Sequence, residues 1–115
     1  MLSAGGWGVE YYFGYKLPQN DLDCQDFRSR DQTWDYCRIA LDFFREENIP
    51  FTEMQNANAL IGNAKDYNTK FCFAKEGRLY IVYLPSGGST DLDLTAAKGS
   101  FRLQWFNPRE GGALK

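Results

Sequence analysis

The sequence contains no histidine among its 115 residues. Without an imidazole, a catalytic triad with a histidine base and a zinc site with a histidine ligand are both excluded. The three cysteines, Cys24, Cys37 and Cys72, include no C-x-x-C pair and cannot all pair within one chain. Their spacings match no metal-binding knuckle, so we expect buried thiols that behave as small apolar side chains, and no metal or cofactor.

Long hydrophobic runs and strong charge are also missing. No stretch approaches the ~18 apolar residues that a membrane span requires. Residues 1–6 carry neither the basic nor the apolar region of a signal peptide. The net charge of −2 argues against a nucleic-acid partner. The charge is uneven, because residues 1–50 hold nine acids and five bases, whereas residues 51–115 hold six acids and eight bases. This asymmetry suggests a chain made of two parts.

Aromatic side chains are abundant, at 17% of the residues. Together with 43% hydrophobic and 24% charged residues, this composition is typical of a folded domain and excludes disorder over most of the length. The length corresponds to one domain, since domains cluster near ~100–150 residues.

The first half predicts a strand, a polar loop and a helix. Residues 9–13 are aromatic and β-branched and are flanked by glycines, as in a strand. The helix is expected over residues 30–47, ending before Pro50. Apolar residues recur there at helical spacing, with Ile39, Ala40 and Phe43 widening a stripe formed by Trp34, Cys37, Leu41 and Phe44. We expect this stripe to pack on the core of the second half or on an adjoining core.

The second half predicts an antiparallel sheet over residues 71–106. Apolar and other residues alternate along four segments, which are separated by turn signals at Glu76-Gly77 and at residues 85–88. Residues 56–61 suggest a short helical turn, and residues 63–69 and 107–112 are turn-like. The expected inner face comprises Phe71, Phe73, Leu79, Ile81, Tyr83, Leu92, Leu94, Phe101, Leu103 and Trp105. The fold class is therefore α+β: one N-terminal strand and a long helix, followed by an antiparallel sheet or half-sandwich.

Both halves resemble parts of a known family. The segments 4–14, 31–35 and 40–44 look like the last strand and helix of the (β/α)8 barrel of apiosidase-like and related bacterial glycoside hydrolases. The remainder resembles the C-terminal β domain joined to such barrels, which is described as collagen-binding. The motifs that carry this second resemblance are Ile49-Pro-Phe-Thr-Glu53, Tyr80-Ile-Val-Tyr-Leu-Pro85, Leu92-Asp-Leu94 and the more specific Trp105-Phe-Asn-Pro-Arg109.

The resemblance implies a domain organisation and a function. Residues 1–48 would be the end of a barrel, and residues 49–115 a C-terminal antiparallel β domain that lacks its last strands. Its function would be that of a non-catalytic part of a bacterial glycoside hydrolase, which supports the barrel or contacts glycan. The alternative is an extracellular module that binds protein, as the collagen-binding name suggests, and a free-standing structural protein is a third reading. The parent protein would be periplasmic or extracellular.

Five residues are the candidates for ligand contact. Glu10 would lie near the end of the last barrel strand, where the active sites of such barrels sit. Trp7, Tyr12 and Phe106 could stack on sugar rings, and Arg109 could bind a carboxylate through two hydrogen bonds. The structural alternatives are a salt bridge for Glu10, barrel-core packing for the rings and, for Arg109, a turn cap or an ion pair with Glu110 or Asp35. No second carboxylate accompanies Glu10, so no catalytic pair is predicted.

The acids Asp21, Asp23 and Asp26 lie in a polar loop without the pattern of a calcium-binding loop, and a solvated loop is expected there. The predicted partners are therefore a polysaccharide or a collagen-like ligand, held by aromatic rings rather than by charge. A truncated sheet and the strand at residues 9–13 would leave exposed edges, which predicts self-association with a second copy.

Overall fold

The computed structural model describes residues 28, 31–65 and 67–115. The described residues form two compact units. They are called here the sheet unit (residues 50–65 and 67–102) and the helix unit (residues 31–49 and 103–115). The predicted strand at residues 9–13 lies outside the described residues.

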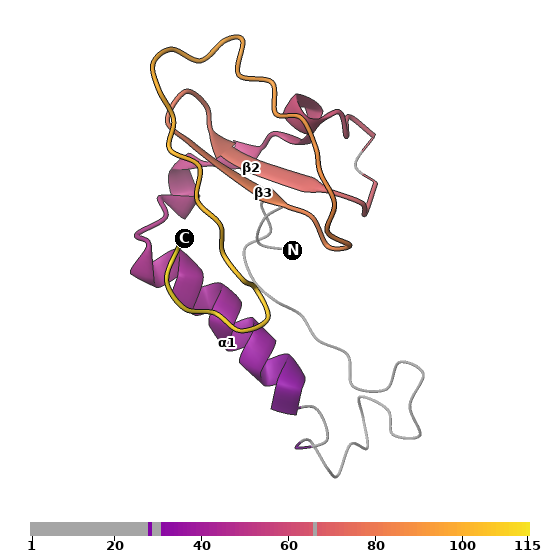
Figure 1. Cartoon of the computed structure of the whole chain (residues 1–115), viewed down its shortest axis with the longest axis vertical. Coiled ribbons are helices and arrows are strands. Elements are labelled where there is room, and N and C mark those ends of the chain that lie inside the picture. The colour runs from indigo at the N-terminus through magenta and orange to yellow at the C-terminus, as the bar shows by residue number, and fades with distance from the viewer. Residues whose placement is uncertain (1–27, 29–30, 66) are drawn as a thin grey trace. The chain divides into compact units, whose positions relative to one another are not determined.

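Helix α1, Asp31–Glu46, is the main element of the helix unit (Figure 1). It confirms the helix predicted over residues 30–47. Asp31 in its first turn and Arg45 in its last turn both complement the helix dipole. After the helix, Asn48 adopts a left-handed conformation with φ of 50°, and Ile49 N–H donates to the Phe44 carbonyl at 3.0 Å. Pro50 then prevents continuation. Among the described residues, no helix is long and apolar enough to cross a bilayer.

Within its own unit, α1 buries the side that carries Ile39 and Phe43. Ile39 is the one buried residue of the helix, and the Phe43 ring packs on Phe106 with ring centroids 4.5 Å apart. The predicted stripe is more open, since Trp34 and Leu41 are both exposed. The sequence placed both Ile39 and Phe43 at the side of the stripe, so the centre of the apolar face differs from the predicted one.

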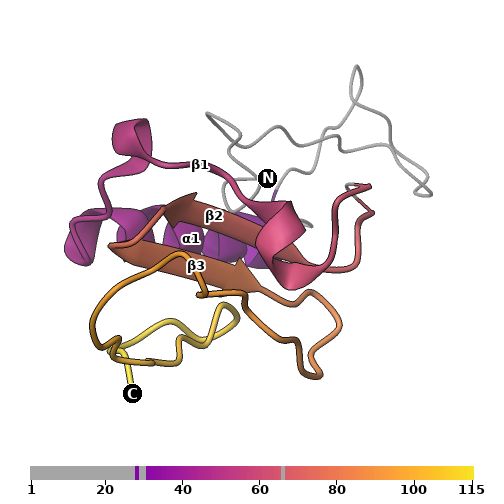
Figure 2. The same ribbon diagram turned by 90° about the horizontal axis from the view of Figure 1, so that it is seen from above.

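The sheet unit contains three antiparallel strands in the order β1, β2, β3 (Figure 2). Their bounds are Gln55–Asn56, Phe71–Lys75 and Leu79–Tyr83, and two short 3-10 helices span Phe51–Glu53 and Asn58–Ile61. Gly77, with φ of 75°, supplies the left-handed residue of the turn between β2 and β3. The predicted hairpin at Glu76-Gly77 and the helical turn within residues 56–61 are thus confirmed.

The core of the sheet unit uses both faces of β2. On one face, Cys72 and Ala74 form a buried cluster with Ala57 and Ile61, against which Leu60, Tyr80, Val82 and Leu92 pack. On the other face, Phe73 is 1% exposed and its ring lies 4.9 Å from that of Phe51. The sequence predicted only the face of Phe73 as the inner one. The short side chains of Cys72 and Ala74 leave room for the neighbouring segments to close over the second face.

The prediction of one sheet over residues 71–106 is wrong in its second half. No strand is present after Tyr83, and Leu103 and Trp105 are 77% and 67% exposed rather than buried. Leu92 does enter the core, but Asp93 N–H donates to the Leu60 carbonyl at 2.8 Å instead of to a neighbouring strand. The Asp93 side chain also accepts hydrogen bonds from the Thr95 N–H and hydroxyl, at 2.9 and 2.7 Å. This local turn competes with a strand ladder and ends the extended segment.

Two buried asparagines organise the connection between β1 and β2. Asn58 Oδ1 accepts the Cys72 N–H at 2.8 Å. Asn63 Nδ2 donates to the carbonyls of Tyr67 and Lys70 at 2.8 and 2.6 Å, and its Oδ1 accepts the Tyr67 N–H at 3.0 Å. The predicted turn at residues 63–69 is confirmed, and the Asn63 side chain closes it.

The Cys72 thiol is expected to be protected from alkylation in the folded protein. The residue is fully buried, and this burial raises the pKa of the Cys72 thiol to about 11, so little of the reactive thiolate exists near neutral pH. Mass spectrometry after brief iodoacetamide treatment should find Cys72 unmodified in native protein and modified in urea. The half-buried Cys37 is the internal comparison, and equal native labelling of both would contradict the buried core.

Candidate functional site

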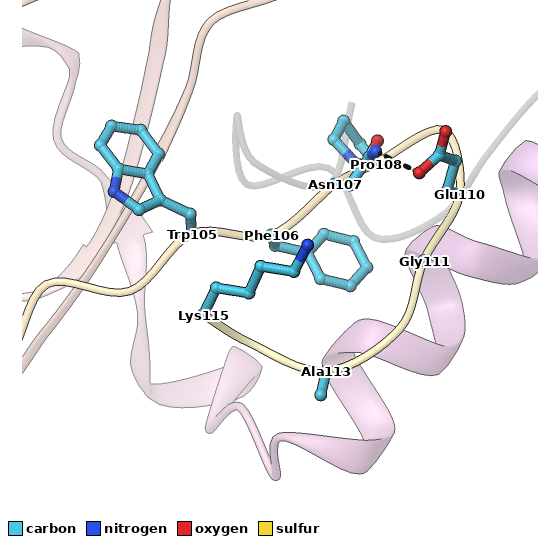
Figure 3. A pocket seen from close by; sticks show the side chains of 8 residues that line it. All are labelled: Trp105, Phe106, Asn107, Pro108, Glu110, Gly111, Ala113 and Lys115. Atoms are coloured by element: carbon cyan, nitrogen blue, oxygen red, sulfur yellow. Dashed lines mark hydrogen bonds between the residues drawn. The ribbon is translucent and has the colours of Figure 1, made fainter.

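A hollow of about 330 Å³ lies in the C-terminal loop, residues 105–115 (Figure 3). All of its lining comes from this one loop of the helix unit. The lining residues are Trp105, Phe106, Asn107, Pro108, Glu110, Gly111, Ala113 and Lys115. Six of them belong to the turn predicted at residues 107–112 or to the aromatic pair that precedes it.

Backbone hydrogen bonds close the C-terminal loop. Trp105 and Lys115 exchange two bonds, with the Trp105 N–H donating at 2.8 Å and the Lys115 N–H at 3.0 Å. This mutual pair is the bonding unit of an antiparallel hairpin. The chain therefore returns toward Trp105 after the two glycines, although no strand forms there.

The turn itself is held by Asn107. Its Nδ2 donates to Glu110 Oε2 at 2.9 Å (Figure 3). Its Oδ1 accepts the Arg109 N–H at 3.0 Å, and its carbonyl accepts the Gly111 N–H at 2.8 Å. Asn followed by Pro favours such a turn, because the amide mimics a backbone group and Pro108 fixes φ. The predicted turn at residues 107–112 is confirmed.

Contacts with α1 anchor the C-terminal loop. The Phe106 ring packs on Phe43, and Gly111 lies against Ile39. A Cβ on Gly111 would come within 3.5 Å of two Ile39 side-chain carbons, and its φ of +71° also favours glycine. The helix and the loop thus form one packed layer within the helix unit.

The two adjacent rings of the loop point in opposite directions. Figure 3 shows the Phe106 ring inside the loop, whereas the Trp105 indole extends away from it. Trp105 is 67% exposed, and Leu103, two residues earlier, is 77% exposed. The sequence predicted Trp105 inside and Phe106 outside, and the structure shows the opposite for this pair, whereas residues 101–104 are all exposed and do not alternate. The reversal follows from Phe43, whose ring offers an apolar partner to Phe106.

Two charged side chains, Glu110 and Lys115, line the hollow, and Arg109 belongs to the same turn. The Arg109 guanidinium forms no ion pair with the residues that the structure describes, and Glu110 is bonded to Asn107 instead. Asp35, the other predicted partner of Arg109, pairs with Arg38 at 3.4 Å. The Arg109 N–H is capped by Asn107 Oδ1 within the turn, and Arg109 is exposed.

A second hollow, of about 390 Å³, lies in the sheet unit and was not indicated by any sequence motif. It is lined by Ala59, Leu60, Ile61, Gly62, Lys70, Asp91, Leu92 and Asp93. Lys70 Nζ donates to Thr90 Oγ1 at 3.1 Å, which fixes its ammonium group at the edge of this hollow. The hydrogen bonds from Thr95 lower the pKa of Asp93, which keeps that carboxylate ionised.

The other sequence candidates fall outside the described residues. These are Trp7, Glu10 and Tyr12, together with the acidic loop of Asp21, Asp23 and Asp26. Of the candidates for ligand contact, Phe106 and Arg109 are thus the two whose surroundings are known. Within residues 28, 31–65 and 67–115, no three acidic or cysteine side chains gather into a metal site.

The described residues define a small α+β domain that presents aromatic and aliphatic side chains on a hydrogen-bonded loop, the surface chemistry of a recognition domain. Residues 56–115 match the model of a family described as "Putative collagen-binding domain of a collagenase". Because the match covers more than half of the chain, the protein belongs to this family. No curated protein and no solved structure matches the chain.

The family match confirms one part of the predicted resemblance. It includes the Trp105-Phe-Asn-Pro-Arg109 motif, and it begins at residue 56, seven residues after the predicted start of the β domain at residue 49. The match does not reach residues 1–48, and no comparison concerns a glycoside hydrolase. A barrel origin for those residues therefore stays a prediction.

Proposed function

We propose that residues 56–115 act as a non-catalytic module that binds an extended, collagen-like polypeptide outside the cell. The observation that carries the proposal is the Trp105 indole, 67% exposed on a loop whose other ring is packed on α1. A large exposed ring costs hydrophobic free energy in water, and a bound ligand would recover it. The family description supports the same reading.

The chemistry of the exposed residues suits a proline-rich chain. Collagen winds three polyproline-type chains, and such chains are commonly recognised by aromatic side chains that pack on proline rings. An indole offers a flat apolar face and one N–H donor for a ligand carbonyl. Leu103, 77% exposed, would extend the apolar contact along the ligand. Because the loop is already closed by hydrogen bonds, little ordering entropy is lost on binding.

The Trp105→Ala variant is expected to bind a triple-helical Gly-Pro-Pro peptide with an affinity at least about fivefold weaker than that of the unmodified chain. The expectation follows from the ~1–3 kcal/mol measured for rings that stack on aromatic side chains in other ligands. Isothermal titration calorimetry at low and at near-molar salt should give similar affinities, because apolar contact is not screened by ions.

The matched control is Tyr67→Ala, which removes another exposed ring, 60% accessible, from the sheet unit. It should leave the affinity unchanged. Equal affinities of the unmodified chain and Trp105→Ala would show that the indole is not part of the binding surface. Loss of binding at high salt would replace the aromatic contact with one led by Lys98, Arg102 and Arg109.

A second candidate function is contact with glycan as an accessory part of a glycoside hydrolase. The observation that favours it is the same exposed indole, since sugar rings also pack on aromatic faces. The resemblance of residues 1–48 to a barrel end would supply the parent enzyme. Titration with soluble polysaccharides in place of the peptide distinguishes the two functions. Binding of polysaccharide without binding of the collagen peptide would favour the accessory role.

A further inference from the structure

The outer edge of β3 carries backbone groups that the sheet does not use. Cys72 directs its N–H to Asn58 Oδ1 and its carbonyl to the Ala57 N–H, so both groups point toward β1. Because backbone groups alternate along a strand, Phe73 points the other way, toward its partner Ile81 in β3. Ile81 therefore bonds inward, and Tyr80 and Val82 direct their N–H and carbonyl groups away from the sheet.

These four groups have no hydrogen-bond partner among the described residues. Beyond the strand, the Leu84 carbonyl is already taken by the Gly87 N–H at 2.9 Å. Proteins usually protect such an edge with charge, proline or a bulge. The strand Leu79–Tyr83 has no charged residue and no proline, and all five of its residues favour β structure.

We propose that two copies of the chain pair antiparallel through β3, with the two-fold axis passing beside Ile81. In this register Tyr80 of each copy lies opposite Val82 of the other copy, and each pair exchanges two hydrogen bonds. Four bonds then satisfy all of the outward backbone groups of both copies. Ile81 faces Ile81 of the second copy at a position without hydrogen bonds, where side chains approach most closely.

A second copy fits this edge because the edge is symmetric. The two outward residues lie on either side of Ile81, so a two-fold axis there pairs every group with an identical strand. Like charges cannot oppose the pairing, since the strand has none. The dimer would continue the antiparallel sheet from one copy into the other. The sequence predicted self-association through exposed strand edges, and the structure points to β3 as the strand that pairs. This inference does not depend on the proposed ligand.

Disulfide trapping tests the register. In the full chain with Cys24→Ser and Cys37→Ser, the variant Ile81→Cys should form a covalent dimer under mild oxidation, because the facing Cα atoms would lie ~4.5 Å apart. The matched control is Tyr80→Cys, whose two Cα atoms would lie diagonally across the axis at ~7–8 Å, too far for a disulfide, and whose neighbour in β2 is Ala74 rather than Cys72. Cys72 is fully buried and remains in both variants. Equal cross-linking of the two variants would overturn the register.

Charge substitutions at the axis test the association itself. Sedimentation equilibrium of the unmodified chain should show a mass that rises with concentration from 13.2 kDa toward twice that value. Ile81→Lys and Ile81→Glu should each remain monomeric because like charges would face each other, whereas an equimolar mixture of the two should dimerise. The mixture also shows that both variants are folded. An unmodified chain that stays monomeric at high concentration would overturn the proposal. The β3 edge would then be a pairing site for a strand of another protein.

Discussion

The Phe73→Ala variant is expected to lose roughly 3–5 kcal/mol of the free energy of unfolding. Phe73 is 1% exposed, is among the largest fully buried side chains described, and packs on the Phe51 ring. Alanine at this position removes that contact and leaves a cavity in the middle of β2, which is the central strand. Small domains have a total stability of ~5–15 kcal/mol, so the variant would retain a small margin or unfold.

Urea denaturation followed by circular dichroism measures this loss. The matched control is Phe101→Ala, whose ring is 39% exposed and makes one edge contact with Tyr80 at 5.6 Å. An exposed edge contact contributes only ~0.5–1.5 kcal/mol, so the control should retain most of the stability. Similar urea midpoints for the two variants would mean that Phe73 is not at the centre of the core.

The elements that could be predicted from sequence are those with local signals. The helix was predicted within one residue of each end, because its apolar spacing and Pro50 both act within a few residues. The hairpin between β2 and β3 was predicted from Glu76-Gly77 for the same reason. These signals do not require knowledge of the tertiary partner.

The predictions that failed depended on distant partners. Residues 91–94 and 101–106 alternate as strands do, but alternation does not show whether a neighbouring strand is available. In the structure, Asp93 bonds to Leu60 and Thr95 instead. The orientation of Trp105 depends on its neighbour Phe106, whose ring packs on Phe43. Phe43 lies more than sixty residues earlier in the chain. The sequence therefore predicted Trp105 inside and Phe106 outside, whereas the Trp105 ring is exposed and the Phe106 ring packs on Phe43.

Asn63 is a buried polar residue that the sequence pattern does not distinguish from an exposed one. Residues 63–69 contain two asparagines, and both are equally consistent with a turn. Only the tertiary fold decides that Asn63 is 3% exposed whereas Asn68 is exposed. The Asn63 amide reaches the carbonyls of Tyr67 and Lys70, and so joins the loop to the start of β2.

The Asn63→Ala variant is expected to lose about 1–3 kcal/mol of the free energy of unfolding, because three hydrogen bonds disappear and their backbone partners are left partly buried. The matched control is Asn68→Ala in the same loop, whose exposed side chain should change stability by less than ~0.5 kcal/mol. Urea denaturation of both variants measures the difference.

A third variant separates the two halves of the Asn63 amide. Asn63→Asp keeps the oxygen that accepts the Tyr67 N–H but places a second oxygen where the amide donates to the Tyr67 and Lys70 carbonyls. The ionised side chain would be buried and would face two acceptors, so at neutral pH this nearly isosteric variant should be at least as unstable as Asn63→Ala. Stability equal to that of the unmodified chain would show that the two donated bonds do not hold the loop. A loss in Asn63→Asp would identify these donated bonds as the connection between the loop and the sheet.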